Sequence, residues 1–154
     1  MDRDFQIKRL EKHDVPLLKK LIDIFDDVFE NAVHSVASET YLQMLLEKSE
    51  FIALAAVPGE EVLGGLTAYE LPMYYTEESE LYLYDIAVKT DSQRKGIGKK
   101  LLSALSDYCR QHEIREMFVE AHEEDQHAVD FYHTAGGHPE KVVHFNFPTG
   151  DFKK

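Results

Sequence analysis

The segment from residue 93 to residue 100 reads Gln-Arg-Lys-Gly-Ile-Gly-Lys-Lys, and its residue types and spacing point directly to anion binding. It follows an apolar stretch typical of a strand and leads into an amphipathic stretch typical of a helix. The first backbone N–H groups of a helix have no intrahelical partner and lie at the positive end of its dipole. Glycine leaves these amides open to a bulky anion, and nearby lysine and arginine side chains add attraction at longer range. The segment therefore predicts a site for an anion such as a pyrophosphate.

Two familiar phosphate-binding patterns do not fit this segment. A Walker A loop requires a glycine where the chain has Gln93, and a serine or threonine where it has Lys100. A dinucleotide-binding fingerprint requires a third small residue where the chain has Leu101. The anion site therefore belongs to another class of protein.

Asp85 is the candidate acid–base residue, because it lies within the most strand-like segment of the chain. Strict alternation places Leu81 and Leu83 on its own face of the strand. It places Tyr84 and Ile86 on the opposite face. A carboxylate among such neighbours is costly unless it is paired, hydrogen-bonded or turned to a cleft. Asp85 is therefore either a strand-end aspartate held by backbone N–H groups or a base that binds an ammonium group and removes its proton.

A group of acidic side chains lies between an expected strand that ends near residue 121 and an expected helix that follows Asp125. It is either a solvated helix start, where acids suit the dipole, or the border of a cleft for a cationic molecule. Its members are Glu120, Glu123, Glu124 and Asp125, the same loop carries His122 and His127, and Glu70 and Glu80 are further candidates for the same surface.

Cys109 and the eight histidines are the other residues that could react or bind a metal. Cys109 lies on the inward face of an expected helix and has no evident basic partner, so we expect no nucleophilic role. The histidines show no His-x-x-x-His pair or other spacing typical of metal ligands. We therefore expect no metal site.

These residues must be positioned by strands and helices that alternate along the whole chain. Alternating polarity and continuous apolar runs predict strands at 5–10, 51–57, 62–71, 80–88, 116–121 and 142–147. Helical spacing predicts a helix capped by Asp14 with Pro16 in its first turn, a short helix after Ser38, a long helix after Gly98, and a helix after Asp125 that Gly136 and Gly137 end. This order predicts one mixed α/β domain across residues 1–154.

The charge of the chain is strongly negative overall but reverses in the segment that holds the anion site. The 154 residues include 29 acidic and 17 basic side chains, for a net charge of −12. Residues 51–88 hold seven acidic and no basic side chains, whereas residues 89–115 hold seven basic and three acidic ones. This balance argues against nucleic acid or an anionic membrane as a partner. It favours a cationic partner together with an anionic ligand.

Length, composition and cysteine content predict one cytoplasmic domain. A chain of this length with 44% hydrophobic residues can bury one core without covalent staples. A single cysteine excludes a disulfide framework within the chain and fits a reducing compartment. No apolar run approaches the roughly 18 residues of a membrane span, and the first residues lack the pattern of a signal peptide.

The pattern Gln/Arg-x-x-Gly-x-Gly/Ala between a strand and an amphipathic helix resembles the acetyl-CoA signature of the GNAT superfamily of N-acetyltransferases. Here it runs from Gln93 to Gly98, and a later strand and the pair Phe131 and Tyr132 follow in that family's order. Segments 51–56, 68–72, 82–88 and 143–145 look like the short type I aminoglycoside 3-N-acetyltransferases. The resemblance covers nearly the whole chain. It implies the GNAT fold, an α/β (α+β) domain with a mixed, mostly antiparallel central sheet of about six to seven strands flanked by about four helices.

The resemblance implies transfer of an acetyl group from acetyl-CoA to the 3-amino group of a polycationic aminoglycoside, and hence antibiotic resistance. It implies that Asp85 helps to remove the amine proton and that Tyr132, otherwise a core tyrosine by its helical spacing, protonates the departing thiolate. We expect strand 86–88 to bind pantetheine through backbone hydrogen bonds and to polarise the thioester carbonyl through an amide. The resemblance also suggests a homodimer, and no metal is expected. The residues assigned to acetyl-CoA are Ile86, Ala87, Val88, Gln93, Arg94, Lys95, Gly96, Ile97, Gly98, Lys99 and Lys100, and those assigned to the acceptor are Glu70, Glu80, Glu120, His122, Glu123 and Asp125.

Two other functions stay open on the sequence alone. The same scaffold could acetylate a polyamine or a protein or peptide amine, which changes only the acceptor. A non-catalytic acyl-CoA-binding module would bind acetyl-CoA tightly without turnover.

Overall fold

The computed structural model describes residues 4–31 and 36–151 and divides into two compact units, Met1–Glu120 and Ala121–Lys154. Each unit has its own secondary structure. The expectation of one domain across residues 1–154 stays a prediction. None of the helices in the described ranges is long and apolar enough to cross a membrane.

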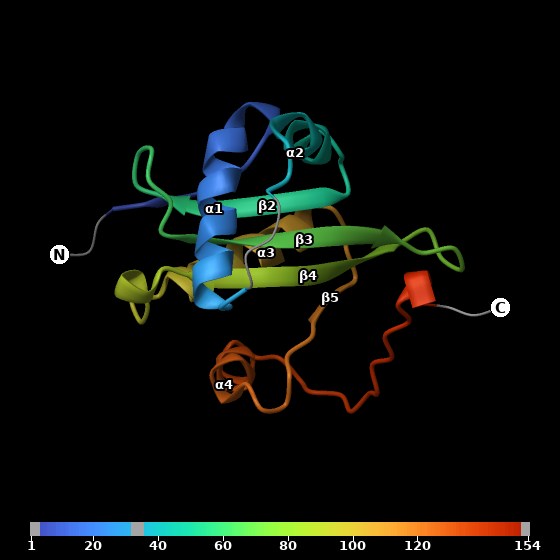
Figure 1. Cartoon of the computed structure of the whole chain (residues 1–154). Helices are drawn as coiled ribbons and strands as arrows, with labels where there is room; N and C mark the ends of the chain where they lie inside the picture. Colours follow the sequence, from blue (N-terminus) through green and yellow to red (C-terminus); the bar gives the residue numbers. More distant parts are fainter. Residues whose placement is uncertain (1–3, 32–35, 152–154) are drawn as a thin grey trace. The chain divides into compact units, whose positions relative to one another are not determined.

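The first unit is built on a five-stranded sheet whose spatial order follows the chain (Figure 1). The strands are β1 (Gln6–Arg9), β2 (Phe51–Val57), β3 (Gly64–Pro72), β4 (Ser79–Val88) and β5 (Glu116–Val119). Neighbours from β1 to β4 are antiparallel, and β4 and β5 are parallel. The mixed, mostly antiparallel α/β architecture is therefore confirmed, with five strands where about six to seven were expected.

Helices cover both faces of this sheet (Figure 1). Helices α1 (Val15–Val28) and α2 (Glu39–Leu46) lie over one face, and α3 (Ile97–Gln111) lies over the other. The inward side chains repeat at helical spacing, so each long helix presents one apolar stripe to the sheet. They include Leu18, Leu21, Ile24 and Phe25 in α1, and Leu101, Leu102, Leu105 and Cys109 in α3.

The two helices that precede β2 begin in different ways. Helix α2 follows Ser38 as expected, and the Ser38 hydroxyl caps it by accepting a hydrogen bond from the Tyr41 N–H at 3.2 Å. Asp14 occupies the cap position of α1, but its carboxylate makes no bond to that helix. It instead accepts hydrogen bonds from the Glu11 N–H at 2.9 Å and from Lys8 Nζ at 2.7 Å. The helix boundary was predicted correctly, whereas the side-chain cap at Asp14 was not.

The core of the first unit is continuous around β2, which is buried along its whole length. This fits a strand that has strands on both edges and helices over both faces. Gly65 of β3 lets α1 approach the sheet, because a Cβ at this position would lie 2.7 Å from Leu21 Cδ1. Ala87 of β4 belongs to the same buried cluster as the inward side chains of α1.

The second unit contains α4 (Gln126–Thr134), which begins and ends as the sequence predicts. The Asp125 carboxylate accepts a hydrogen bond from the Ala128 N–H at 3.1 Å. At the other end, Gly136 has a φ of 98°, a conformation that favours glycine. Its N–H bonds the His133 carbonyl at 3.0 Å, and the Gly137 N–H bonds the Tyr132 carbonyl at 2.9 Å. This Schellman arrangement ends the helix.

The expected final strand at residues 142–147 is not formed. These residues have no regular secondary structure, and Val142, Val143 and Phe145 are exposed. Alternating polarity suits a strand, but a strand also needs a neighbour for its N–H and C=O groups. No strand of the described residues in this unit supplies that neighbour, so the prediction was wrong here.

Candidate functional site

A β-bulge in β4 determines which way Asp85 faces. Asp85 stands opposite Thr67 of β3, while Leu83 stands opposite Ala68, so Tyr84 is an extra residue on β4. Because a shift of one residue moves the side chains that follow to the other face of a sheet, Asp85 shares the face of Thr67 rather than that of Leu83. The expectation that Leu81 and Leu83 flank it on its own face was therefore wrong, because strict alternation does not hold across a bulge.

Asp85 is a half-buried carboxylate on the face of the sheet that carries α1 and α2. Burial raises its pKa above the ordinary value. Within the described residues, no hydrogen bond or ion pair reaches this carboxylate. It is therefore not an aspartate satisfied by backbone N–H groups. A carboxylate with these properties can pair with an ammonium group and accept its proton.

The pairing of β4 with β5 ends where the bulge begins. The last pair in this ladder joins Leu83 to Val119, whereas β4 continues to Val88. From Asp85 to Val88, no described strand pairs with this edge of β4. Ala87 is buried, so its backbone rather than its side chain is offered to a ligand. An extended chain with amide groups can add to such an edge through backbone hydrogen bonds.

The loop between β4 and α3 is held by a hydrogen bond within the loop region and leaves the first N–H groups of α3 without a side-chain cap. Gln93 Nε2 donates a hydrogen bond to the Val88 carbonyl at 3.0 Å. Arg94 and Gly96 have φ angles of 61° and 80°, and α3 begins directly after Gly96 without a side-chain cap. Its first N–H groups therefore keep their full capacity to bind an anion. The helix begins at Ile97 and includes Gly98, whereas the sequence pattern placed its start after Gly98.

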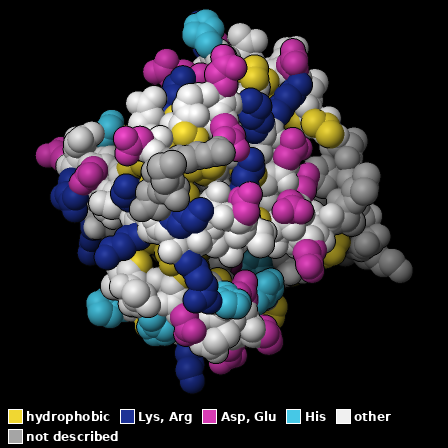
Figure 2. Space-filling view, turned by 90° about the vertical axis from the view of Figure 1, so that its left-hand side faces the viewer, with side chains coloured by type: hydrophobic (Ala, Val, Ile, Leu, Met, Phe, Trp, Pro, Cys, Tyr) yellow, Lys and Arg dark blue, Asp and Glu magenta, His cyan; other side chains and the backbone are white. Residues whose placement is uncertain are grey.

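The basic side chains of this loop do not all serve the same role. Arg94, Lys95 and Lys99 are exposed and form no ion pair within the described ranges. The Lys100 ammonium instead lies over the Phe5 ring, 4.5 Å from its centroid. Ile97 is buried, so it offers only its backbone amide. Figure 2 looks onto the side of the molecule that carries this loop and shows several Lys and Arg side chains across that surface.

The acidic candidates of the first unit divide between the two faces of the sheet. Glu80 pairs with Leu71 and so shares the face of Tyr82 and Asp85, although it lies near the start of β4. Glu120 lies close enough to Tyr82 to contribute, after burial, to its raised pKa. Glu70 pairs with Leu81 on the opposite face.

On that opposite face Glu70 contacts α3 rather than the surroundings of Asp85. It accepts a hydrogen bond from the Tyr108 hydroxyl at 3.3 Å. The structure therefore brings Glu120 to the face of Asp85 and separates Glu70 from it.

The remaining candidates lie in the second unit. Tyr132 is in α4, partly buried, with its ring centroid 5.4 Å from that of Phe131. Asp125 caps α4, which is the structural role weighed for it from the sequence. His122 and Glu123 are exposed in the preceding turn. Residues 85 and 132 thus belong to different units.

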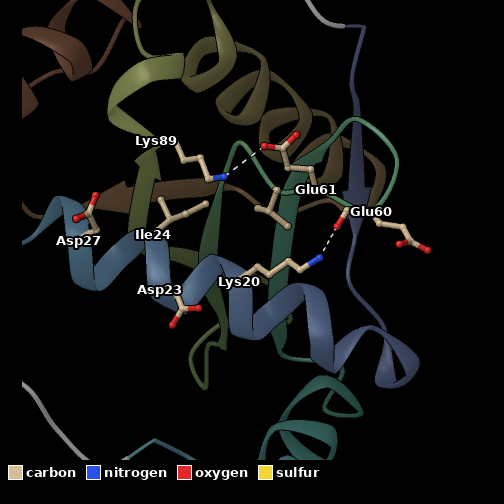
Figure 3. A pocket seen from close by; sticks show the side chains of 8 residues that line it. Lys20, Asp23, Ile24, Asp27, Glu60, Glu61 and Lys89 are labelled. Carbon is tan, nitrogen blue, oxygen red and sulfur yellow. Dashed lines mark hydrogen bonds and ion pairs between the residues drawn. The ribbon is translucent and has the colours of Figure 1, made fainter.

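A cavity that sequence reasoning missed lies in the first unit beside α1, with a volume of about 570 Å³ (Figure 3). Lys20 Nζ donates to the Glu60 carbonyl at 2.6 Å, and Lys89 Nζ lies 3.5 Å from Glu61 Oε1. Its other lining residues are Asp23, Ile24, Asp27 and Val62. None of the residues assigned to the site from the sequence lines it. Its carboxylates come from separate surface segments, α1 and the β2–β3 loop, which no linear pattern connects.

Two further kinds of site, a metal-binding cluster and a reactive thiol, depend on the histidine, cysteine and carboxylate side chains of the described residues. No group of three or more His, Cys, Asp or Glu side chains there could hold a metal ion. Cys109 is buried, and burial raises the pKa of its thiol. A thiol with a raised pKa is a poor nucleophile at neutral pH.

Comparison with known proteins identifies relatives that cover most of the chain. A model of the acetyltransferase (GNAT) family matches residues 18–136. The uncharacterized N-acetyltransferase YhfO of Bacillus subtilis (strain 168) is 23% identical over 130 residues, which are 84% of this chain and 87% of that protein.

Solved structures resemble this one closely. The aminoglycoside acetyltransferase meta-AAC0020, from an uncultured soil metagenomic sample, was solved in complex with trehalose and in complex with sisomicin. The first is 39% identical with a TM-score of 0.91 and covers 95% of this chain and 97% of its own. The second is 38% identical with a TM-score of 0.90 and covers 93% of this chain and 95% of its own. The aminoglycoside N-acetyltransferase AAC(6')-Iy in complex with CoA shares the fold, at 14% identity and a TM-score of 0.79 over 96% and 97% of the chains.

Proposed function

We propose a specific function for this chain, which belongs to the GNAT family of N-acetyltransferases: it transfers an acetyl group from acetyl-CoA to the 3-amino group of an aminoglycoside and so confers resistance. The observation that carries the proposal is the half-buried Asp85 carboxylate, which lacks a partner within the described residues and lies beside the open edge of β4. Such a carboxylate is suited to an amine that must lose a proton before it reacts.

The residues around the β4–α3 loop fit acetyl-CoA. The uncapped start of α3 and the left-handed Gly96 offer backbone amides to a pyrophosphate, with Arg94, Lys95 and Lys99 near in the chain. The open edge at Ile86, Ala87 and Val88 suits the amide-bearing pantetheine arm. When bound, acetyl-CoA supplies an acetyl group activated as a thioester.

The proposed reaction needs two proton transfers by side chains of this protein. Asp85 accepts a proton from the acceptor ammonium, directly or through water, and leaves a neutral amine. As the new C–N bond forms and the C–S bond breaks, the Tyr132 hydroxyl donates its proton to the leaving sulfur. The nitrogen releases its second proton as the amide forms, and a proton returned through solvent restores the Tyr132 hydroxyl. A backbone N–H at residues 86–88 stabilises the negative charge that develops on the carbonyl oxygen. No step requires a metal.

The choice of an aminoglycoside as acceptor rests on charge and on the relatives. Glu80 and Glu120 share the face of Asp85, and a polycation is attracted to such a surface. A relative that is 38% identical was solved in complex with sisomicin. The 3-position follows from the resemblance to the type I enzymes. The cytoplasmic location and the homodimer expected from the sequence stay predictions.

An amine screen tests the proposal. Purified protein is mixed with acetyl-CoA and a panel that holds gentamicin, sisomicin, a polyamine and a peptide with a free N-terminus. We expect release of CoA thiol with the aminoglycosides, and NMR of the product to place the acetyl group on the 3-amino nitrogen. Thiol release only with the polyamine or the peptide would overturn the substrate assignment, and acetylation at another nitrogen would overturn the regiochemistry.

A further inference from the structure

Three tyrosines, Tyr69, Tyr82 and Tyr84, lie together on the face of the sheet that carries Asp85. The ring centroid of Tyr84 lies 5.7 Å from that of Tyr69 and 5.5 Å from that of Tyr82, with interplanar angles of 79° and 68°. Tyr82 stacks on Phe118 of β5 at 4.8 Å and 8°. The Tyr69–Tyr82 pair is the next pair on this face along the ladder from the Thr67–Asp85 pair, so the carboxylate lies near both rings.

Tyr84 differs from the other two tyrosines because its ring remains accessible. Tyr69 packs on the core and on Phe51, and Tyr82 is covered on one side by Phe118. Tyr84 is 57% exposed although two rings hold it in place. Its position on the bulge, directly before Asp85, explains both properties.

An accessible aromatic ring beside a carboxylate is suited to a particular kind of ligand. The face of a tyrosine ring carries negative potential and attracts a cation within about 6 Å of its centroid. Asp85 and Glu120 add negative charge to the same surface. A ring with two dihedral angles, already held by its neighbours, loses little entropy when a ligand packs on it. The surface therefore matches a ring-shaped polyamine better than a neutral or anionic molecule.

We propose that Tyr84 is a specificity-determining residue of the acceptor site, and that an ammonium-bearing sugar ring packs on its aromatic face while one amine lies at Asp85. The inference rests on the proposed function and adds the means of acceptor recognition. Tyr84 does not take part in proton transfer. It determines how tightly a cationic ring is held, and therefore acts on the acceptor KM rather than on kcat.

Steady-state kinetics of the full chain with gentamicin and acetyl-CoA test this assignment. Tyr84→Leu removes the aromatic face but keeps bulk, and it should raise the gentamicin KM about tenfold while the acetyl-CoA KM stays within about twofold. Tyr84→Phe keeps the aromatic face and should recover most of the gentamicin affinity that Tyr84→Leu loses. Tyr75→Leu is the matched control, because Tyr75 is 62% exposed and also contacts another tyrosine, but lies in the β3–β4 turn.

The outcomes separate this proposal from the proposed function. Wild-type protein that acetylates no aminoglycoside refutes both. An active wild type whose gentamicin KM is unchanged by Tyr84→Leu refutes the Tyr84 assignment alone, as does a Tyr84→Phe variant that loses as much as Tyr84→Leu. If Tyr84→Leu does not fold, as judged by thermal melting, Tyr84→Thr removes the ring with a residue suited to strands and gives the same readout.

Discussion

Asp85 of β4 stands opposite Thr67 of β3, although the preceding pair joins Leu83 to Ala68. This single step out of register turns Asp85 to the face of α1 and α2 and leaves Tyr84 accessible beside it. The ladder between β4 and β5 ends at Leu83 as well. One extra residue in β4 therefore coincides with both the orientation of the proposed base and the open strand edge proposed for the cofactor.

Asp85→Asn should abolish most of the activity without weakening cofactor binding. The amide keeps the shape of the side chain but cannot accept the amine proton, so we expect kcat to fall about 100-fold or more. Acetyl-CoA affinity, measured by calorimetry in the absence of acceptor, should be unchanged. A variant that keeps more than half of the wild-type kcat at its optimum pH would remove Asp85 from the role of base.

The same variant should be more stable than the wild type at neutral pH. Burial raises the folded-state pKa of Asp85 above its unfolded value, so the charged form destabilises the folded state. The wild type therefore loses stability as pH rises from the unfolded value near 4 through the folded pKa. Thermal melting should give a higher Tm for Asp85→Asn at pH 7 and nearly equal Tm values at low pH. A lower Tm at pH 7 would contradict a burial penalty at this carboxylate.

Tyr132→Phe should lower kcat with little change in the KM for acetyl-CoA. The substitution removes only the hydroxyl that would protonate the leaving sulfur, and loss of a general acid costs about 100-fold or more. Phe131→Leu serves as a control, because it alters the neighbouring ring of α4 and leaves the hydroxyl in place. If Tyr132→Phe turns over like the wild type, the acid is another group.

Gly96→Ala should weaken acetyl-CoA binding in addition to lowering the stability of the fold. Gly96 and Gly59 have nearly equal φ angles, 80° and 79°, and an added Cβ would meet no atom within 4 Å at either position. Each substitution should therefore cost about 1 kcal/mol of stability from backbone strain. Gly59→Ala is thus the matched control, and only Gly96→Ala should raise the acetyl-CoA KM, because its Cβ stands at the start of α3. Equal effects on KM would place the cofactor elsewhere.

Glu120→Gln and Glu70→Gln each neutralise one carboxylate, but on opposite faces of the sheet. We expect Glu120→Gln to raise the aminoglycoside KM several-fold, since a charge near the acceptor is lost. Glu70→Gln should leave that KM unchanged, because Glu70 contacts Tyr108 of α3. Kinetics at low salt show the contrast best, since salt screens such charges. A larger rise in the aminoglycoside KM for Glu70→Gln than for Glu120→Gln would show that the acceptor does not bind at the face of Asp85.

Much of this fold could be predicted because its signals are local. Ser38 and Asp125 cap their helices through bonds to residues three positions away, and Gly136 adopts the conformation that ends α4. The apolar run of β2 indicates a strand buried on both faces without knowledge of its neighbours. The prediction failed at residues 142–147, where alternation suited a strand but no partner strand is present in the described part of that unit.

The amino-acid sequence by itself determined the types of residue available and their order: a carboxylate in a strand, a glycine-bearing basic loop before a helix, and a tyrosine in a later helix. Those features depend on neighbours within a few positions, so they can be recognised in one dimension. Only the tertiary structure decided that Asp85 lies on the face of the sheet that carries Tyr82 rather than on the face of Leu83. It also decided that Glu70 and Glu120 lie on opposite faces. A bulge is defined by the pairing of two strands, and such pairing depends on which distant residues meet across the sheet.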